Sequence, residues 1–480
     1  MKSLKSKVVT GARWSILDNI LKNGISFIVG IVLARLLSPL EYGLIGIVTI
    51  IINVLNSMVD GGFGNALIRK KDIIQEDYNT VFFINITLSF ILAFLLFLLA
   101  PFISYFFGNE QLIELVRVMS VAIIINAFTI VHKSVLTKQL DFKLQTKITL
   151  ISVIVSGFIG ITMAFCGYGV WSLVGQYISM QTTTAICFWI KNKWKPSFSF
   201  SHESFKDLFG FGSKLLLANL LDNIWKHVYQ IVIGRCYNMT TLGLYSKAHN
   251  IASLPSVNIS VVIQRVSFPA LSTMQDNSEE LKQAYKKFIK TTMYLTFSCM
   301  FMLCALAKPL VIVLLGDKWS DAVPYLQVCC LSLVLYPLHA INLNMLQVKG
   351  RSDLYLYLDI IKKILSILPI VLGVFVGIFW MLWASVVFSL VSYFLNSFYS
   401  GKMIDYSVKQ QINDIKSSFI ITSFPSLCIY ALTYIKISNY ILLPVLLLLG
   451  ILFIVSLSRV LKISEYDELS KIIKVTKNEK

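Results

Sequence analysis

Residues 80–103 read TVFFINITLSFILAFLLFLLAPFI, a run of 24 residues that contains no charged side chain. A helix that crosses a membrane needs roughly 20 apolar residues, because the hydrocarbon core is about 30 Å thick and a helix rises about 1.5 Å per residue. The stretches 417–436 and 438–458 are similarly apolar. These three stretches predict membrane-spanning helices.

The same character continues along almost the whole chain. Its 480 residues are 56% hydrophobic and only 14% charged, with a mean hydropathy of +0.72, whereas soluble domains are about a quarter charged. A soluble enzyme, a disulfide scaffold and a disordered protein are excluded. We expect an all-α, polytopic membrane protein with about fourteen transmembrane helices, at residues 14–36, 40–59, 80–103, 112–131, 148–166, 169–190, 212–235, 241–266, 289–315, 322–347, 354–378, 379–399, 417–436 and 438–458. The first, seventh, eighth and eleventh of these are rich in polar residues, and hydropathy alone is expected to miss them.

The formal net charge of +18 also fits a membrane protein. Lysine and arginine gather in alternate connecting segments, as the preference for cytoplasmic basic loops requires. A nucleic-acid partner is therefore not expected, and both termini are predicted to be cytoplasmic. The basic segments lie at 2–7, 69–71, 133–147, 191–206, 282–290, 349–351, 402–416 and 459–480.

An internal repeat suggests two lobes. ARLLSPLEYGLIG (34–46) resembles GRCYNMTTLGLYS (234–246), and APFISYFFG (100–108) resembles KPLVIVLLG (308–316). Both offsets correspond to six helices, so the two copies share one orientation, a parallel repeat common in transporters. The predicted parts are a six-helix lobe, a basic and aromatic connector at the membrane interface, a second six-helix lobe, and two extra transmembrane helices with a basic tail. They span residues 1–190, 191–211, 212–400 and 401–480.

The first helix of each predicted lobe carries the same charged pattern. Asp18 and Lys22 are four residues apart, as are Asp222 and Lys226, so each pair shares one helix face. An ionisable group at the bilayer centre costs about 2.5–3.5 kcal/mol on insertion scales. Each pair either holds helices together or lines a cavity, and its recurrence in both lobes favours the cavity.

Other polar residues inside the spans complete a candidate substrate site. A single asparagine more often joins helices than contacts a ligand, and lysines such as Lys362 could extend to the interface. Together these residues would form a hydrated cleft with a net positive charge. Such a cleft suits a diphosphate, and its side-chain amides would form hydrogen bonds with sugar hydroxyls. The candidates are Asp18, Lys22, Asn23, Asp222, Asn223, Lys226, His227, Asn258, Gln264, Arg265, Asn342, Asn344, Asp359 and Lys362.

Motifs for covalent chemistry are missing from the sequence. There is no Walker motif, Gly-rich phosphate loop or nucleophile–base motif, so we predict a transporter without catalytic residues, cofactor or metal. The eight cysteines form no CxxC pair and are predicted to be small packing residues. Coupling to protons or sodium stays open, with Asp18 and Asp222 as the carboxylates to suspect.

Several stretches resemble a known family. The chain is similar to the Wzx-type flippases for lipid-linked oligosaccharides, within the multidrug/oligosaccharidyl-lipid/polysaccharide exporter superfamily. The resembling stretches are DGGFGNALIRKKDIIQEDYNTVFFIN (60–85), LGLYSKA (242–248), LPSVNISVVIQRVSFPALS (254–272), LLGDKWSDAVPYLQ (314–327) and NLNMLQVKGRSDL (342–354).

This resemblance implies both a fold and a function. The implied fold has two six-helix lobes around a central cavity, two extra C-terminal helices and alternating access. The implied substrate is an undecaprenyl-diphosphate-linked repeat unit, moved from the inner to the outer leaflet of a bacterial inner membrane for lipopolysaccharide, capsule or exopolysaccharide synthesis. Implied partners are a polysaccharide polymerase and chain-length machinery. Relatives often carry an acidic residue before the end of the seventh helix, but HVYQIVIGR (227–235) has Tyr229 and Gln230 there, so no ion-binding carboxylate is transferred.

Two other functions are weighed against a flippase. An exporter of small cationic drugs would need an acidic or aromatic pocket, whereas cations outnumber acids in the predicted spans. A membrane glycan polymerase would be expected to expose a large outer loop, and the predicted outer loops are short. Both alternatives are therefore less favoured.

Overall fold

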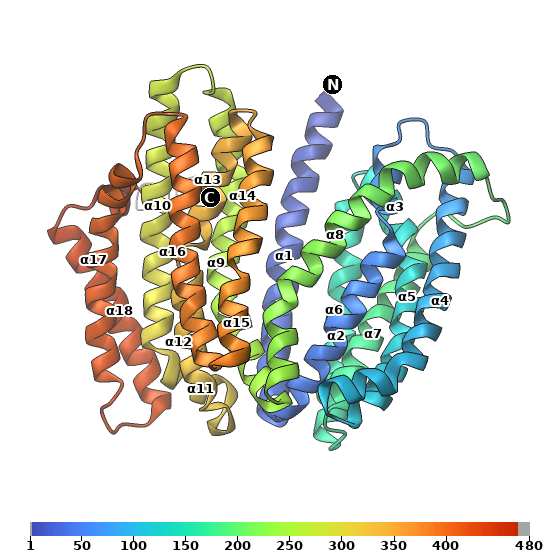
Figure 1. Cartoon of the computed structure of the whole chain (residues 1–480), viewed down its shortest axis with the longest axis horizontal. Coiled ribbons are helices and arrows are strands. Elements are labelled where there is room, and N and C mark those ends of the chain that lie inside the picture. The colour runs from blue at the N-terminus through green and yellow to red at the C-terminus, as the bar shows by residue number, and fades with distance from the viewer. Residues whose placement is uncertain (1, 469–480) are drawn as a thin grey trace. The chain divides into compact units, whose positions relative to one another are not determined.

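The computed structural model describes the backbone of residues 2–468 and, within that range, all side chains except those of residues 2–13, 15–17, 19–20, 211 and 214. All regular elements in this range are helical (Figure 1). They are α1 (Lys2–Leu36), α2 (Pro39–Asp60), α3 (Phe63–Arg69), α4 (Gln75–Phe107), α5 (Gln111–Lys138), α6 (Phe142–Phe165), α7 (Trp171–Lys191), α8 (His202–Cys236), α9 (Met239–Thr273), α10 (Ser278–Ala305), α11 (Ala307–Leu315), the short 3₁₀ helix η1 (Asp317–Trp319), α12 (Ala322–Leu333), α13 (Tyr336–Val348), α14 (Ser352–Leu365), α15 (Ile367–Phe375), α16 (Ile378–Lys402), α17 (Val408–Leu432) and α18 (Asn439–Val460).

Each of the fourteen predicted spans coincides with one helix or with two consecutive helices, which confirms the all-α polytopic fold. The ninth, tenth and eleventh spans are each divided in two. A proline ring clashes with the carbonyl four residues earlier and removes a helical hydrogen bond. At each division a proline stands four residues after the end of the first helix: Pro309 after Ala305, Pro337 after Leu333, and Pro369 after Leu365.

Within the described residues, ten helices are long and apolar enough to cross a membrane. The first, seventh and eleventh spans fall outside this set, and the eighth is its least apolar member. The eleventh is divided into helices of 14 and 9 residues, each shorter than a membrane span, and several side chains of the first lie outside the described residues. The sixth span, in α7, also falls outside, because Gln176, Gln181 and three consecutive threonines lower its hydropathy. The chain is a multi-pass membrane protein whose most polar helices do not stand out by hydropathy.

The chain divides into two compact units, unit 1 at Met1–Gly243 and unit 2 at Leu244–Lys480. In unit 1, α8 packs on α2, α3 and α4, although its residues 212–235 were predicted to open the second lobe. The close approach of α8 depends on glycines. A Cβ atom at Gly62 would lie 2.5 Å from the carbonyl oxygen of Gly212, and a Cβ atom at Gly212 would lie 2.8 Å from the carbonyl oxygen of Gly61. Residues 202–211, predicted as connector, form the first turns of α8.

The repeated glycines of the sequence lie opposite each other in unit 1. A Cβ at Gly43 would clash with the Met239 carbonyl at the start of α9, and a Cβ at Gly243 would clash with the Pro39 carbonyl at the start of α2. Gly43 of α2 therefore packs against the first residue of α9, and Gly243 of α9 packs against the first residue of α2. This reciprocal contact gives a physical reason for the recurrence of a glycine at the same place in both copies.

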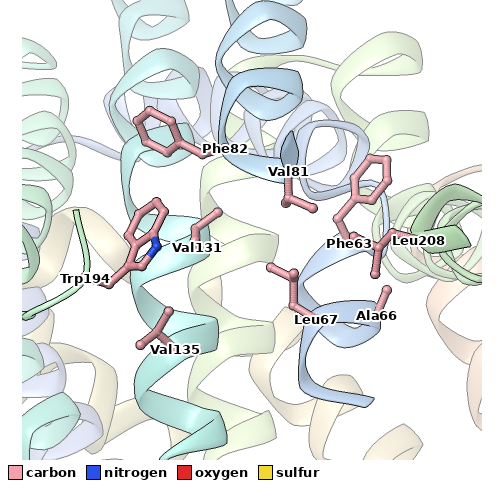
Figure 2. Close-up of a cluster of buried hydrophobic side chains, with 9 residues drawn as sticks. All are labelled: Phe63, Ala66, Leu67, Val81, Phe82, Val131, Val135, Trp194 and Leu208. Carbon is pink, nitrogen blue, oxygen red and sulfur yellow. The ribbon is translucent and has the colours of Figure 1, made fainter. Parts of the chain in front are cut away.

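The connector, residues 192–201 in the structure, is attached to unit 1 by a hydrophobic cluster (Figure 2). Trp194 is only 9% exposed and packs in this cluster with residues of α3, α4, α5 and α8. The members are Phe63, Ala66, Leu67, Val81, Phe82, Val131, Val135, Trp194 and Leu208. Aromatic and aliphatic side chains thus fix the connector against the ends of several helices.

In unit 2, the last two helices pack on its other helices. α17 packs on α10, and α18 on α11 and α17, around a cluster that includes Met302, Ile429 and Leu446. The predicted tail helix begins at residue 464, but residues 469–480 lie outside the described part of the chain. The predicted basic residues Lys2, Lys5 and Lys7 likewise have no described side chains.

Candidate functional site

The apolar helix α2 carries a single polar stripe. Asn53, Asn56, Ser57 and Asp60 are spaced i, i+3, i+4 and i+7, so they share one helix face. Asn53 is exposed and the other three are half-buried. None of them was among the predicted site residues, although their spacing is a signal that the sequence already contains.

Side chains from three other helices of unit 1 meet this stripe. Asn126 on α5 donates its Nδ2 to Oδ1 of Asn56 at 3.1 Å. Asn223 on α8 donates its Nδ2 to Oγ of Ser57 at 2.5 Å. On α7, Tyr177 interacts with Asn56 and with Gln181. The structure therefore joins one predicted residue, Asn223, to a set of amides and hydroxyls that the sequence did not single out.

Charged side chains gather beside the same stripe. Asp18 on α1 interacts electrostatically with Lys22, as its spacing predicts, and also with Lys133 on α5. Lys133 interacts in turn with Asp60, whose carboxylate accepts a hydrogen bond from the backbone N–H of Gly64 at 3.2 Å. Oδ1 of Asp18 is buried without a hydrogen bond. Two carboxylates and two ammonium groups from three helices thus form one mixed-charge cluster.

The remaining predicted residues of α1 and α8 are more open. Asn23, Asp222 and Lys226 are exposed, and Nδ1 of His227 lies 2.7 Å from Oε1 of Gln230 on the same helix. Since Asp222 and Lys226 are exposed while Asp18 and Lys22 are half-buried, the repeated charge pattern has two different environments.

The predicted residues of α9 do not join a buried cluster. Asn258, Gln264 and Arg265 are all exposed. The Nδ2 of Asn258 donates to the carbonyl of Leu254, one turn earlier in the same helix, at 2.7 Å.

Asn342 and Asn344 of α13 are fixed inside unit 2. Asn342 is fully buried, and its Oδ1 accepts hydrogen bonds from the Tyr285 hydroxyl and from Oγ of Ser400, the latter at 3.3 Å. Asn344 is 8% exposed and donates to Oγ of Ser267 at 3.4 Å. Both amides connect helices of unit 2.

A second group of polar side chains lies one turn before Asn342 on α13. Nδ1 of His339 is 3.4 Å from Nδ2 of Asn396, and its Nε2 is 3.3 Å from Oγ of Ser389. Lys362 is half-buried and acts electrostatically on His339. The Asp359 carboxylate instead pairs with Lys363 at 2.9 Å along α14.

The two units therefore offer different chemistry. Unit 1 presents half-buried charges, amides and a phenol, which can exchange their contacts for those of an anionic, hydroxyl-rich ligand. Unit 2 encloses mainly neutral groups: some, such as Tyr285 and Asn342, bond to each other, and others, such as the side-chain amide of Gln411, are buried without a hydrogen bond. Among the described residues, no group of three or more His, Cys, Asp or Glu side chains could hold a metal ion.

Comparison with known proteins places this arrangement in a family. Residues 32–324, more than half of the chain, match the family described as "Polysaccharide biosynthesis protein". The chain is 26% identical over 427 residues to the teichuronic acid biosynthesis protein TuaB of Bacillus subtilis, covering 88% of each chain. It is 25% identical to the lipopolysaccharide biosynthesis protein WzxC of Escherichia coli, covering 77% of this chain and 76% of the relative.

A solved structure shares the fold. The lipid II flippase MurJ in an inward closed conformation superposes with a TM-score of 0.70 at 16% sequence identity, covering 96% of this chain and 99% of that one. This agreement extends over the whole polytopic helical architecture. With the sequence match, it shows that this multi-pass membrane protein belongs to the polysaccharide biosynthesis protein family.

Proposed function

We propose that the protein is a flippase that moves a polyprenyl-diphosphate-linked oligosaccharide from the inner to the outer leaflet of a bacterial cytoplasmic membrane. The two relatives are named for teichuronic acid and lipopolysaccharide biosynthesis, and the fold matches that of a lipid II flippase. The observation that carries the proposal is the mixed-charge cluster of unit 1, which sits in a membrane-spanning bundle and is next to amides and hydroxyls.

Lys22 and Lys133 are the groups assigned to the diphosphate. Lys22 is half-buried and interacts with Asp18. Lys133 is exposed, just beyond the predicted span 112–131, and interacts with the half-buried Asp18 and Asp60. An ionised side chain inside the bilayer normally faces an oppositely charged partner or a water-filled cavity, because placing it in lipid without either costs free energy. A diphosphate entering the cluster would replace the carboxylates as the partner of the lysines.

The nearby amides and the phenol are assigned to the glycan. Asn56, Asn126, Asn223, Gln181 and Tyr177 supply donors and acceptors on one side of the bundle, and sugar hydroxyls bond to such groups in either role. No covalent bond needs to form or break in this process.

The proposed setting follows the basic segments of the sequence. Both termini would be cytoplasmic, because the lysine-rich connections alternate along the chain. Two lobes, with residues 401–480 as an addition, would expose the site to each leaflet in turn. A proton or sodium gradient would drive this exchange, and a polymerase would consume the product.

A flipping assay in proteoliposomes tests the proposal. Liposomes would carry the full-length protein and a fluorescent undecaprenyl-diphosphate oligosaccharide, and an impermeant glycosidase would report the glycans that reach its leaflet. We expect faster exposure than in empty liposomes, and a loss of that gain in Lys22→Gln and Lys133→Gln. The matched control is Lys147→Gln, which removes an exposed lysine outside the cluster. Arg265→Gln tests the cation predicted from the sequence.

The outcomes separate function from site. No acceleration under a proton gradient, a sodium gradient or neither would overturn the flippase. Acceleration that survives both cluster variants but falls in Lys147→Gln or Arg265→Gln would keep the flippase and overturn the assignment of the diphosphate. Efflux of a cationic dye by the same vesicles, without glycan movement, would support the drug exporter.

A further inference from the structure

The connector divides its side chains between the protein interior and its surroundings. Asn192 and Trp194 are buried, whereas Lys191, Lys193 and Lys195 are exposed. Beyond them, Phe198 is 100% exposed and Phe200 is 58% exposed. Exposed ammonium groups therefore lie at the last residue of α7, Lys191, and on Lys193 and Lys195 of the connector. Two aromatic residues follow, of which Phe198 stacks on Phe83 with the ring centres 5.6 Å apart.

Hydrogen bonds hold the connector at the start of the apolar run of α4. The Asn79 amide donates to the hydroxyls of Ser197 and Ser199, each at 2.7 Å. Oγ of Thr80 accepts a bond from the Ser201 backbone N–H at 3.0 Å. Asn79 is fully buried, and Thr80 opens the 24-residue stretch without charged side chains. The connector thus lies at the depth where the polar end of α4 gives way to its membrane-spanning part.

The outward lysines are not neutralised by the protein. Among the described residues, no carboxylate forms an ion pair with Lys191, Lys193 or Lys195. Lys195 instead lies over the ring of Trp189, 5.2 Å from its centre, and its Nζ donates a hydrogen bond to the Trp189 carbonyl oxygen. By contrast, Lys70 nearby pairs with Asp77 at 2.8 Å, and this hydrogen bond raises the pKa of the Lys70 ammonium. Lys193 and Lys195 of the connector, with Lys191 at the end of α7, thus keep their positive charge without a carboxylate partner among the described residues, as do the exposed Lys71 and Lys206 in the neighbouring segments.

We propose that the connector is a binding site for anionic phospholipids of the membrane leaflet that it faces. Lysines at a membrane surface attract anionic headgroups, and aromatic rings insert at the boundary between headgroups and acyl chains. The three exposed lysines alternate along the chain with the buried Asn192 and Trp194, and they share no carboxylate among the described residues, which suits several phospholipid headgroups better than a single soluble phosphate. The hydrogen bonds to α4 hold the segment in this position before lipid binds.

The test uses the full-length protein in nanodiscs of phosphatidylcholine, with or without phosphatidylglycerol. Native mass spectrometry counts bound phosphatidylglycerol, and thermal unfolding gives Tm. We expect the wild type to retain phosphatidylglycerol selectively and to unfold at a higher temperature in its presence. The triple variant Lys191→Gln, Lys193→Gln, Lys195→Gln should lose selectivity at least about tenfold, since each surface lysine contributes about fivefold. Phe198→Ser with Phe200→Ser should weaken retention with all charges kept.

A matched variant decides whether the site is local. Lys402, Lys409 and Lys416 are exposed lysines of unit 2 without ion pairs among the described residues, and their triple change to glutamine removes the same charge. Selectivity that survives this change and is lost in the connector variant supports the proposal. Equal loss in both variants, or no selectivity in the wild type, overturns it. Displacement of phosphatidylglycerol by millimolar inorganic pyrophosphate at constant ionic strength would also overturn it, in favour of a diphosphate site.

Discussion

The polar interiors of the two units differ in charge and in burial. In unit 1, Asp18, Lys22 and Asp60 are half-buried and Lys133 is exposed. In unit 2, Tyr285 and Asn342 are fully buried, neutral and bonded to each other. Ionised groups lose far more than neutral ones when they leave water, so the charged set stays accessible while the neutral set can be sealed. We infer that unit 1 offers the ligand contacts and that unit 2 uses its polar groups for packing.

The largest effect is expected when the buried polar contact between Tyr285 and Asn342 in unit 2 is removed. In Asn342→Leu the hydroxyls of Tyr285 and Ser400 lose their shared acceptor and keep only the longer bonds to Oγ of Ser400, at 3.2 Å, and to the Ser397 carbonyl, at 3.4 Å. Each lost hydrogen bond costs about 0.5–1.5 kcal/mol. We expect a clear fall in Tm, measured by thermal unfolding in nanodiscs. The control is Asn258→Leu on α9, where the amide is exposed, and a change within about 0.5 kcal/mol is expected there. Equal Tm values for the two variants would contradict the assignment.

A smaller effect on stability, but a clear one on transport, is expected in unit 1. Asp18→Asn removes a carboxylate that Lys22 and Lys133 share, and a rise of about 1.4 kcal/mol in the transport barrier would slow flipping about tenfold. The proteoliposome assay measures the rate, and thermal unfolding is its control for folding. The exchange Asp18→Lys with Lys133→Asp should recover part of the rate. A variant as fast as the wild type would remove Asp18 from the site.

The smallest effects concern the basic start of α10, which contrasts with the open connector. Lys287 pairs with Glu468 at 3.0 Å and Lys290 pairs with Glu465 at 3.2 Å. The second pair is less exposed, with Glu465 only 3% exposed. Exposed pairs contribute about 0.2–1 kcal/mol, so Lys287→Gln should lower Tm slightly and Lys290→Gln somewhat more. High salt should reduce the loss in Lys287→Gln. The reverse order would show that burial does not govern these pairs.

Much of the architecture follows from local sequence patterns. The sequence placed a helix at each of the fourteen predicted spans, and ten described helices are long and apolar enough to cross a membrane, where a helix satisfies its backbone hydrogen bonds within one segment. Pro309 and Pro337 stand where spans divide, since the missing N–H acts within one helical turn, but Pro101, Pro255 and Pro425 lie inside undivided helices, so the sequence alone does not tell which proline divides a span. The repeated glycines at positions 43 and 243 were visible as a pattern, and so was the charge spacing of Asp18 and Lys22.

The partners of the polar residues could not be obtained in this way. Asn342 and Asn126 are both asparagines in apolar helices, yet one is sealed against Tyr285 and the other joins an accessible stripe. The lysines of α10 and of the connector look alike in sequence, but only those of α10 meet carboxylates, some of which lie more than a hundred residues away. Spans are set by interactions within a segment, whereas the role of a polar side chain depends on which distant helix faces it and how much water remains there.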